Sequence, residues 1–236
     1  MTASEIVGIL KAALEAGYVL FAPVPTERGV VLQKTNDPSE ISLEHILTLN
    51  TLKDVIYPSL EEVVTYRQDT VEIEPKEIEP SEVLIFGARP CDARSVQILD
   101  KVLLGDIKDK RYEQRRSQVT ILTVACSKTD FACFCTSVGS HPHDTAGSDI
   151  ILLPSRGRYL LRCISERGKE FLKDIGATEE EGEVDAPPDV KPLEVFANLK
   201  TWLDENFDNP KWEKVSENCL SCAICTYLCP TCHCFD

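Results

Sequence analysis

Hydrophobic residues near the start of the chain recur every three or four positions, the period of a helix with one buried face. This pattern ends at Gly17, a residue type common just after helices, and Thr2 with Glu5 has the spacing of a capping box. A first helix is therefore expected, followed by two short strands over residues 18–24 and 29–34.

The middle of the chain alternates short apolar runs with a helical pattern. Residues 82–87 and 119–125 are apolar runs typical of buried strands, and a helix between them is expected to begin after Asp92 as its N-cap. Strand, helix and strand within this length predict a βαβ unit with parallel strands. A hairpin turning at residues 155–157 follows, whereas the weaker pattern before this unit predicts a short helix over 60–66.

The last third of the chain changes in composition. Residues 178–192 are rich in glutamate and proline, so they cannot bury much apolar surface and are interpreted as an exposed linker. We therefore expect an α/β domain with a mixed sheet over residues 1–177, and a helix followed by a small ferredoxin-like iron–sulfur segment over 193–236. An apolar stripe favours a helix packed on the main domain, with a partner-binding helix as the alternative. The stripe consists of Leu193, Phe196, Leu199, Leu203 and Phe207.

Composition and charge limit the kinds of partner that the chain is expected to bind. With 236 residues, 43% of them hydrophobic, the chain can form one large domain and an appendage. Its net charge of −14 argues against nucleic acid or an anionic membrane surface as a partner. The start has no basic leader, and Lys11 and Glu15 interrupt the nearest apolar stretch, so neither a signal peptide nor a membrane-spanning helix is expected.

Cysteine changes this picture most. The chain has eleven, and six crowd into residues 219–234, which paired disulfides do not explain. Four of them, followed by Pro230, have the ferredoxin spacing C-x2-C-x2-C-x3-C-P, which lets one tight loop aim three thiolates at one iron–sulfur cluster. These four are Cys219, Cys222, Cys225 and Cys229. Cys232 and Cys234 are further candidate ligands.

A zinc site is the alternative for these thiols. Structural zinc usually takes two ligand pairs separated by a dozen or more residues, and a third cysteine at the same short spacing fits that pattern poorly. Reduced, metal-bound thiolates indicate a cytoplasmic, anaerobic setting. The sequence contains no dinucleotide-binding, Walker or nucleophile-elbow motif, so no catalytic residue is predicted.

Four more cysteines lie near the predicted parallel strands. Cys91 follows the first strand and Cys126 ends the second, so both are expected at the carboxyl edge of the sheet, where open α/β sheets place their sites. Cys133 and Cys135 lie in the next loop, where function is a stronger reason for a residue than packing. A second metal or redox site and ordinary packed thiols both stay open, since cysteine is often buried for packing alone.

Several stretches resemble a known family. Residues 86–94, the Cys-Phe-Cys-Thr-Ser motif at Cys133 and the terminal cysteine run are similar to the iron–sulfur beta subunits of cytosolic sulfhydrogenase (NiFe hydrogenase) and to the A subunit of anaerobic sulfite reductase. Residues 53–58 share a weaker likeness. The resemblance implies a subunit that relays electrons through [4Fe-4S] clusters, between a flavin- and NAD(P)H-binding subunit and a catalytic subunit. That catalytic subunit is expected to be of the hydrogenase, sulfite reductase or heterodisulfide reductase type.

By this resemblance, three terminal cysteines bind one cluster and Cys229 reaches a second. Family members continue past the pair matching Phe235-Asp236 to a second run of the same spacing, whereas this sequence stops. The chain is therefore either truncated at Asp236 or takes its missing ligand from Cys229, Cys232, Cys234 or another subunit, so the number of clusters stays open.

We expect an electron-transfer subunit rather than a stand-alone catalyst. Thiolate ligation suits one-electron chemistry, and Arg89 and Arg94 are candidates for tuning the potential. A zinc-stabilised interaction module and a redox sensor are the non-catalytic alternatives. Thiol or disulfide chemistry on a sulfur substrate in the region 91–135 is a third.

Overall fold

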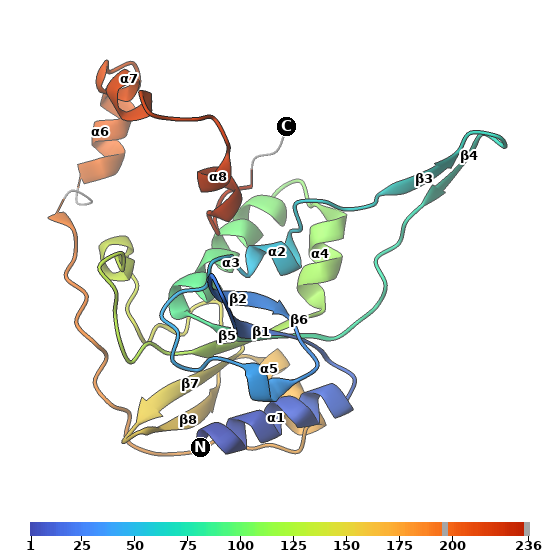
Figure 1. Ribbon diagram of the computed structural model, residues 1–236, viewed down its shortest axis with the longest axis vertical. Coiled ribbons are helices and arrows are strands. Elements are labelled where there is room, and N and C mark those ends of the chain that lie inside the picture. The colour runs from blue at the N-terminus through green and yellow to red at the C-terminus, as the bar shows by residue number, and fades with distance from the viewer. Residues whose placement is uncertain (195–197, 234–236) are drawn as a thin grey trace.

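The computed structural model describes residues 1–194 and 198–233 and contains one six-stranded mixed sheet (Figure 1). The strand order is β2-β1-β5-β6-β7-β8. Its parallel strands are β1 (Val19–Thr26), β5 (Val83–Ala88), β6 (Val119–Val124) and β7 (Ile150–Ser155). The antiparallel edge strands are β2 (Gly29–Lys34) and β8 (Arg158–Cys163). The expected α/β class, mixed sheet and βαβ unit are confirmed.

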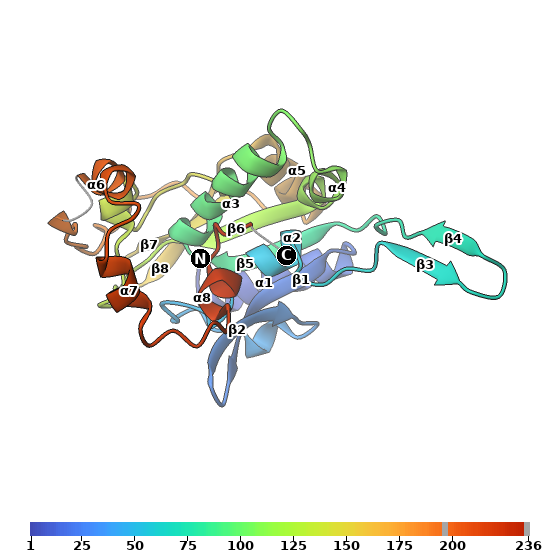
Figure 2. The same ribbon diagram turned by 90° about the horizontal axis from the view of Figure 1, so that it is seen from above.

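Helices cover both faces of this sheet (Figure 1, Figure 2). One face carries α1 (Ala3–Glu15) and α5 (Glu166–Asp174). The other face carries α2 (Lys53–Ile56), α3 (Pro90–Leu103) and α4 (Lys110–Ser117). Two short 3-10 turns complete the body, η1 (Pro38–Glu40) and η2 (Cys135–Val138).

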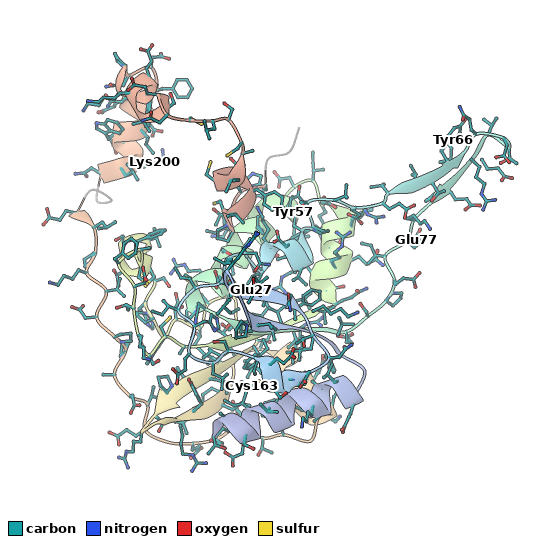
Figure 3. The ribbon with its side chains drawn as sticks, in the orientation of Figure 1. Glu27, Tyr57, Tyr66, Glu77, Cys163 and Lys200 are labelled. Atoms are coloured by element: carbon teal, nitrogen blue, oxygen red, sulfur yellow. The ribbon has the colours of Figure 1, made fainter. Side chains whose placement is uncertain are left out.

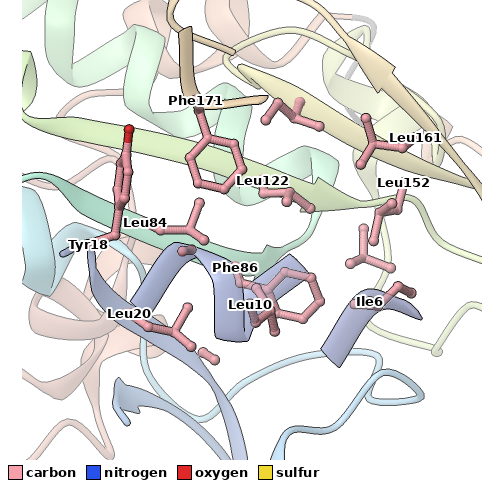
Figure 4. Packing of buried hydrophobic residues seen from close by; sticks show 14 of the residues in the cluster. Ile6, Leu10, Tyr18, Leu20, Leu84, Phe86, Leu122, Leu152, Leu161 and Phe171 are labelled. Carbon is pink, nitrogen blue, oxygen red and sulfur yellow. The ribbon is translucent and has the colours of Figure 1, made fainter. Parts of the chain in front are cut away.

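Each face of the sheet has its own hydrophobic core. On the first face, Ile6 and Leu10 of α1 pack with Leu84, Phe86 and other strand residues (Figure 4). On the second face, inward residues of β5 and β6 pack with Val96 and other residues of α3. All six residues of β6 are buried, because helices cover both sides of this parallel strand. Four of the six are apolar, and the hydroxyl of the buried Thr123 lies 2.7 Å from that of Ser148.

The local signals of the first helix are borne out. The amide of Glu5 donates to Thr2 Oγ1 at 3.3 Å, and the amide of Thr2 donates to the Glu5 carboxylate, which completes the capping box. The predicted start of α3 is wrong by three residues, because the N-cap is Arg89 rather than Asp92. Pro90, whose φ is fixed and which lacks an N–H, opens the helix, and the Asp92 carboxylate accepts the Arg89 amide at 3.1 Å.

The helix expected over residues 60–66 is wrong. Helix α2 ends at Ile56, and β3 (Val64–Arg67) pairs with β4 (Glu72–Pro75) in a separate two-stranded ribbon. The β-branched residues Val63, Val64 and Thr65 favour a strand because their side chains restrict χ1 in a helix.

Beyond α5, residues 178–192 form no helix or strand and are mostly exposed, although Val190 is buried. This extended segment is bonded to the body, since the Asp185 amide donates to the Pro154 carbonyl at 2.8 Å. The described residues that follow form three short α-helices, α6 (Leu199–Glu205), α7 (Lys211–Ser216) and α8 (Ile224–Leu228). The division into domains stays a prediction.

The apolar stripe does not produce the helix that was expected. Helix α6 begins at Leu199, Phe196 lies outside the described residues, and Trp202 packs edge-on against Trp212 of α7 with ring centroids 5.7 Å apart. None of the described residues of α6 is buried. The two helices therefore pack on each other, because their indole rings cover each other's apolar surface. Among the described residues, no helix is long and apolar enough to cross a bilayer.

Candidate metal centre

The terminal cysteine run lies against α2, and Lys53 holds it there. This lysine is only 7% exposed. Its ammonium donates to the carbonyl oxygens of Tyr227 and Cys229 at 2.9 Å each and of Cys232 at 3.1 Å. Three acceptors match the three N–H groups of a lysine, so the chain's own backbone solvates this buried charge.

Two neighbouring side chains extend the contact between the run and the body. The Ser59 hydroxyl lies 2.8 Å from the Tyr227 hydroxyl, and the Tyr57 hydroxyl donates to the His233 carbonyl at 3.4 Å. Both lie within three residues of the end of α2. The weakly family-like segment 53–58, together with Ser59, therefore forms the docking site for the run.

Within the run, the loop before α8 turns sharply. Ser221 and Ala223 have left-handed backbone conformations with φ of 52° and 58°, and the Ser221 amide donates to Cys219 Sγ at 3.4 Å. Cys225 lies in the first turn of α8 and Cys229 directly follows its last residue. Such N–H···S bonds stabilise negative charge on sulfur and tune the potential of iron that it binds.

The thiol of Cys229 ionises more readily than an ordinary cysteine. Burial acts to raise the pKa of its thiol, but hydrogen bonds from Thr231 and Cys232 outweigh burial and lower the pKa to about 7. The thiolate, rather than the thiol, is the metal ligand. Near neutral pH a large fraction of Cys229 is therefore thiolate, the form that a metal ion requires.

The thiols of the run are chemically suited to bind an iron–sulfur cluster. Their arrangement in the described part of the run, however, does not form a complete set of ligands around one point. Throughout residues 1–194 and 198–233, no three His, Cys, Asp or Glu side chains are grouped so as to hold a metal ion. Cys219, Cys222 and Cys225 are exposed, whereas Cys229 and Cys232 are half-buried. Cys234 lies outside the described residues.

Cys91 and Cys126 lie just beyond the carboxyl ends of the parallel strands β5 and β6, and Cys133 and Cys135 lie in the loop that follows. Burial raises the pKa of Cys126 to about 11; the thiols of Cys133 and Cys135 add to the rise, and Arg89 opposes it. Cys91 keeps contact with solvent, yet protein surrounds enough of its sulfur that burial, then Asp92 and the other thiols, raises its pKa. The four sulfurs thus lie close enough to influence each other's charge.

Comparison with known proteins agrees with these features. Over 239 residues the chain is 30% identical to the sulfhydrogenase 2 subunit beta of Pyrococcus furiosus. The aligned region covers 94% of this chain and 68% of that protein. The chain belongs to the sulfhydrogenase beta subunit family. No family model and no solved structure matches it. The resemblance that the cysteine motifs indicated is therefore confirmed.

In this member of the family, Arg94 fixes the loop that carries Cys133 and Cys135. Its guanidinium binds the Gly139 carbonyl and, at 3.1 Å, the Asp144 carboxylate. The Asp130 amide donates to Cys133 Sγ at 3.3 Å. The loop is thus held at its far end by an ion pair, and one of its thiols already accepts a backbone donor.

The extended segment after α5 is bonded to the same loop. Thr136 Oγ1 donates to the Val190 carbonyl at 2.9 Å, and the Leu193 amide donates to Ser137 Oγ at 2.8 Å. Residues 178–193 therefore pass beside the middle cysteines on their way to the terminal run.

Arg89 is a buried cation beside the middle cysteines of this family member. Its side chain, 5% exposed, donates from Nε to the Ile46 carbonyl at 3.2 Å and from Nη1 to the Val124 carbonyl at 3.1 Å. Burial lowers its pKa, and the negative charge that Cys126 can carry has the opposite effect. Arg89 therefore favours ionised sulfur at this edge of the sheet.

Sequence reasoning missed His45. Its Nδ1 donates to the Ser42 carbonyl at 2.9 Å, while its buried Nε2 has no hydrogen-bond partner among the described groups. Burial, then the charge of Arg89, lowers the pKa of His45 to about 4, so the ring is neutral. With Arg89, Cys126 and Lys128 it lines a small hollow. A single histidine without a spaced partner gives no sequence signal, which is why only the fold reveals it.

Proposed function

We propose that the chain is the electron-relay subunit of a hydrogenase-type oxidoreductase in the cytoplasm. The relative from Pyrococcus furiosus is named as a subunit of sulfhydrogenase 2, which supports membership in a complex of that type. The strongest support is the ferredoxin-spaced cysteine run that Lys53 holds against the α/β body. A relay needs its redox group at a fixed position, and this contact provides one.

The terminal residues divide into ligands and support. Cys219, Cys222 and Cys225 would hold one [4Fe-4S] cluster and Cys229 would reach a second, with Cys232 and Cys234 as further candidates. When bound, a cluster supplies reversible one-electron chemistry. Lys53 places a positive charge beside the ligand run, which favours the more negative, reduced state.

Cys91, Cys126, Cys133 and Cys135 are proposed as a second iron–sulfur site. Their mutual effects on pKa, and the buried guanidinium of Arg89 beside them, support a place for several negative sulfurs. Arg89 would offset part of that charge, and Arg94 would keep the loop in position.

The partners proposed are a flavin- and NAD(P)H-binding subunit and a catalytic redox subunit. This chain carries no dinucleotide-binding motif of its own, so the hydride chemistry belongs to another subunit.

Anaerobically purified protein tests the relay. It is expected to contain iron and sulfide in equal amounts, to absorb broadly in the visible range and to give an EPR signal after dithionite. Cys219→Ala and Cys222→Ala should each remove iron, because each deletes a ligand, while Cys163→Ala serves as a matched control in β8. Zinc without iron would contradict the proposal and favour an interaction module.

Replacement of Cys133 and Cys135 by alanine tests the second site. Loss of one cluster's iron would show that these residues are ligands. Full iron content with lost turnover in the complex would instead support thiol chemistry on a sulfur substrate. Full iron content with unchanged turnover would identify them as ordinary thiols.

A further inference from the structure

The ribbon β3–β4 extends away from the sheet and helices in both views (Figure 1, Figure 2). It leaves the body shortly after α2 and returns to it at β5. Figure 3 shows Tyr66 on this ribbon, far from the main body of side chains. Nothing in the relay proposed above uses it.

Pairing of the two strands gives the ribbon two different faces. Val64 lies opposite Pro75 and Tyr66 opposite Ile73, so one face is apolar. The alternate pairs on the other face, Thr65 with Glu74 and Arg67 with Glu72, are polar. Val64, Tyr66 and Ile73 are 51%, 54% and 65% exposed, so the apolar face is open to solvent.

The base of the ribbon, in contrast, is fixed. Glu61 forms ion pairs with Arg111 and Arg115 of α4. Arg111 also donates to the Lys76 carbonyl at 2.6 Å, and the Lys76 amide donates to the Val63 carbonyl at 2.9 Å. The ribbon is therefore held in a defined direction and does not swing freely on long flexible ends.

An isolated two-stranded ribbon is marginally stable in water, so an open apolar face on one indicates a surface that covers it. Charge identifies the kind of surface. Residues 61–79 contain seven acidic side chains and two basic ones, in a chain of net charge −14. A second copy of this chain would bring the same negative charge and be repelled, whereas a basic surface would be attracted.

We propose that the apolar face of β3–β4 docks onto a redox partner subunit, at an apolar patch rimmed by lysine and arginine. This inference rests on the relay function proposed above. Ser59, just before the ribbon, contacts Tyr227 of the terminal run. The ribbon therefore starts near the terminal run, and a partner that covers both the ribbon and the surface at its base would also reach the cysteines that exchange electrons with it.

The test uses the complete complex, purified anaerobically from the native host through a tag on this chain, with its subunits identified by mass spectrometry. Hydrogen–deuterium exchange of residues 60–78 is expected to be at least tenfold slower in the complex than in the isolated chain. Tyr66→Ser combined with Ile73→Ser should release the subunit that carries flavin or additional metal. The control, Thr65→Ala with Arg67→Gln on the polar face, should retain it.

Iron content and the EPR signal of this chain separate the two proposals. If both persist in the apolar-face variant while the partner is lost, the docking surface is supported. The docking proposal is overturned if ribbon exchange is the same in both states or the variant keeps its partner. It is also overturned if the tagged chain purifies alone or only with copies of itself. A wild-type chain without iron would contradict the relay function instead.

Discussion

Lys53 is the central residue of the docking site, and its buried side chain is held by hydrogen bonds rather than by hydrophobic packing. Lys53 has no carboxylate partner among the hydrogen bonds described for its ammonium; it uses three backbone carbonyls of the cysteine run. Burying a charge costs free energy unless it is compensated, so this arrangement exists only while the run is in place. Docking of the cysteine run and burial of the Lys53 ammonium therefore occur together.

Lys53→Met is expected to release the run while the body stays folded. Hydrogen bonds to a charged group contribute about 1.5 to 3 kcal/mol each, so even one lost bond corresponds to a tenfold or larger effect. Amides of residues 219–233 should exchange at least tenfold faster in hydrogen–deuterium exchange. Lys11→Met, at an exposed lysine of α1, is the matched control and should leave exchange unchanged. Unchanged exchange in Lys53→Met would show that the run is held by other contacts.

Helix α5 and the start of β1 are tied together by one tyrosine. The ring of Tyr18 packs edge-on against Phe171 at 5.1 Å, and its hydroxyl donates to the Asp174 carboxylate at 3.0 Å (Figure 4). Burial, then this hydrogen bond, raises the pKa of Tyr18 to about 12. The tie between the two elements is therefore sensitive to alkaline pH.

The Tyr18→Phe variant is expected to lose less folding stability than wild type as pH rises. The unfolded phenol has a pKa of about 10, below the folded value, so the unfolded chain loses its proton first as pH rises. The contribution of the protonated Tyr18 to the free energy of unfolding is complete below about pH 10 and disappears as pH rises toward about 12. Urea unfolding at pH 9 and pH 11 should show a smaller fall for Tyr18→Phe than for wild type. Tyr66→Phe, at an exposed tyrosine, should behave like wild type, and an equal fall in all three proteins would refute this assignment.

The whole molecule consists of a body that contains both hydrophobic cores and a terminal segment fastened to its surface. The two buried clusters lie entirely within residues 1–172. The terminal segment adds none of these residues; it reaches α2 by way of the linker and the α6–α7 pair. Stability of the body and iron binding by the terminal run should therefore be separable.

A chain ending at Pro192 is expected to keep the body and lose only the iron of the run. Circular dichroism and the urea midpoint should stay close to those of the full chain, since both cores remain. Iron held by the middle cysteines should persist, because all four lie before the cut. Complete loss of iron in a folded truncated chain would show that the middle cysteines bind none.

Sequence reasoning succeeded where the signal was local. The Thr2 and Glu5 spacing gave the first helix, and the apolar runs around Cys91 and Cys126 gave a parallel pair with both thiols at one edge. It failed over residues 60–66, where a short apolar run has no clear period and β-branched side chains decided for a strand. The role of Lys53 was beyond its reach, because the partners of that lysine lie in a distant part of the chain.

That separation also affects how the protein is made. The carbonyls that Lys53 binds belong to residues 174 to 179 positions further along the chain. Ribosomes add about 5 to 20 residues per second, so Lys53 leaves the ribosome roughly ten seconds or more before the cysteines reach it. During that interval the rest of the body is synthesised and can fold, so the terminal run emerges when Lys53 is already in place. Folding of the body before docking of the run is therefore the order of assembly that this long-range contact favours.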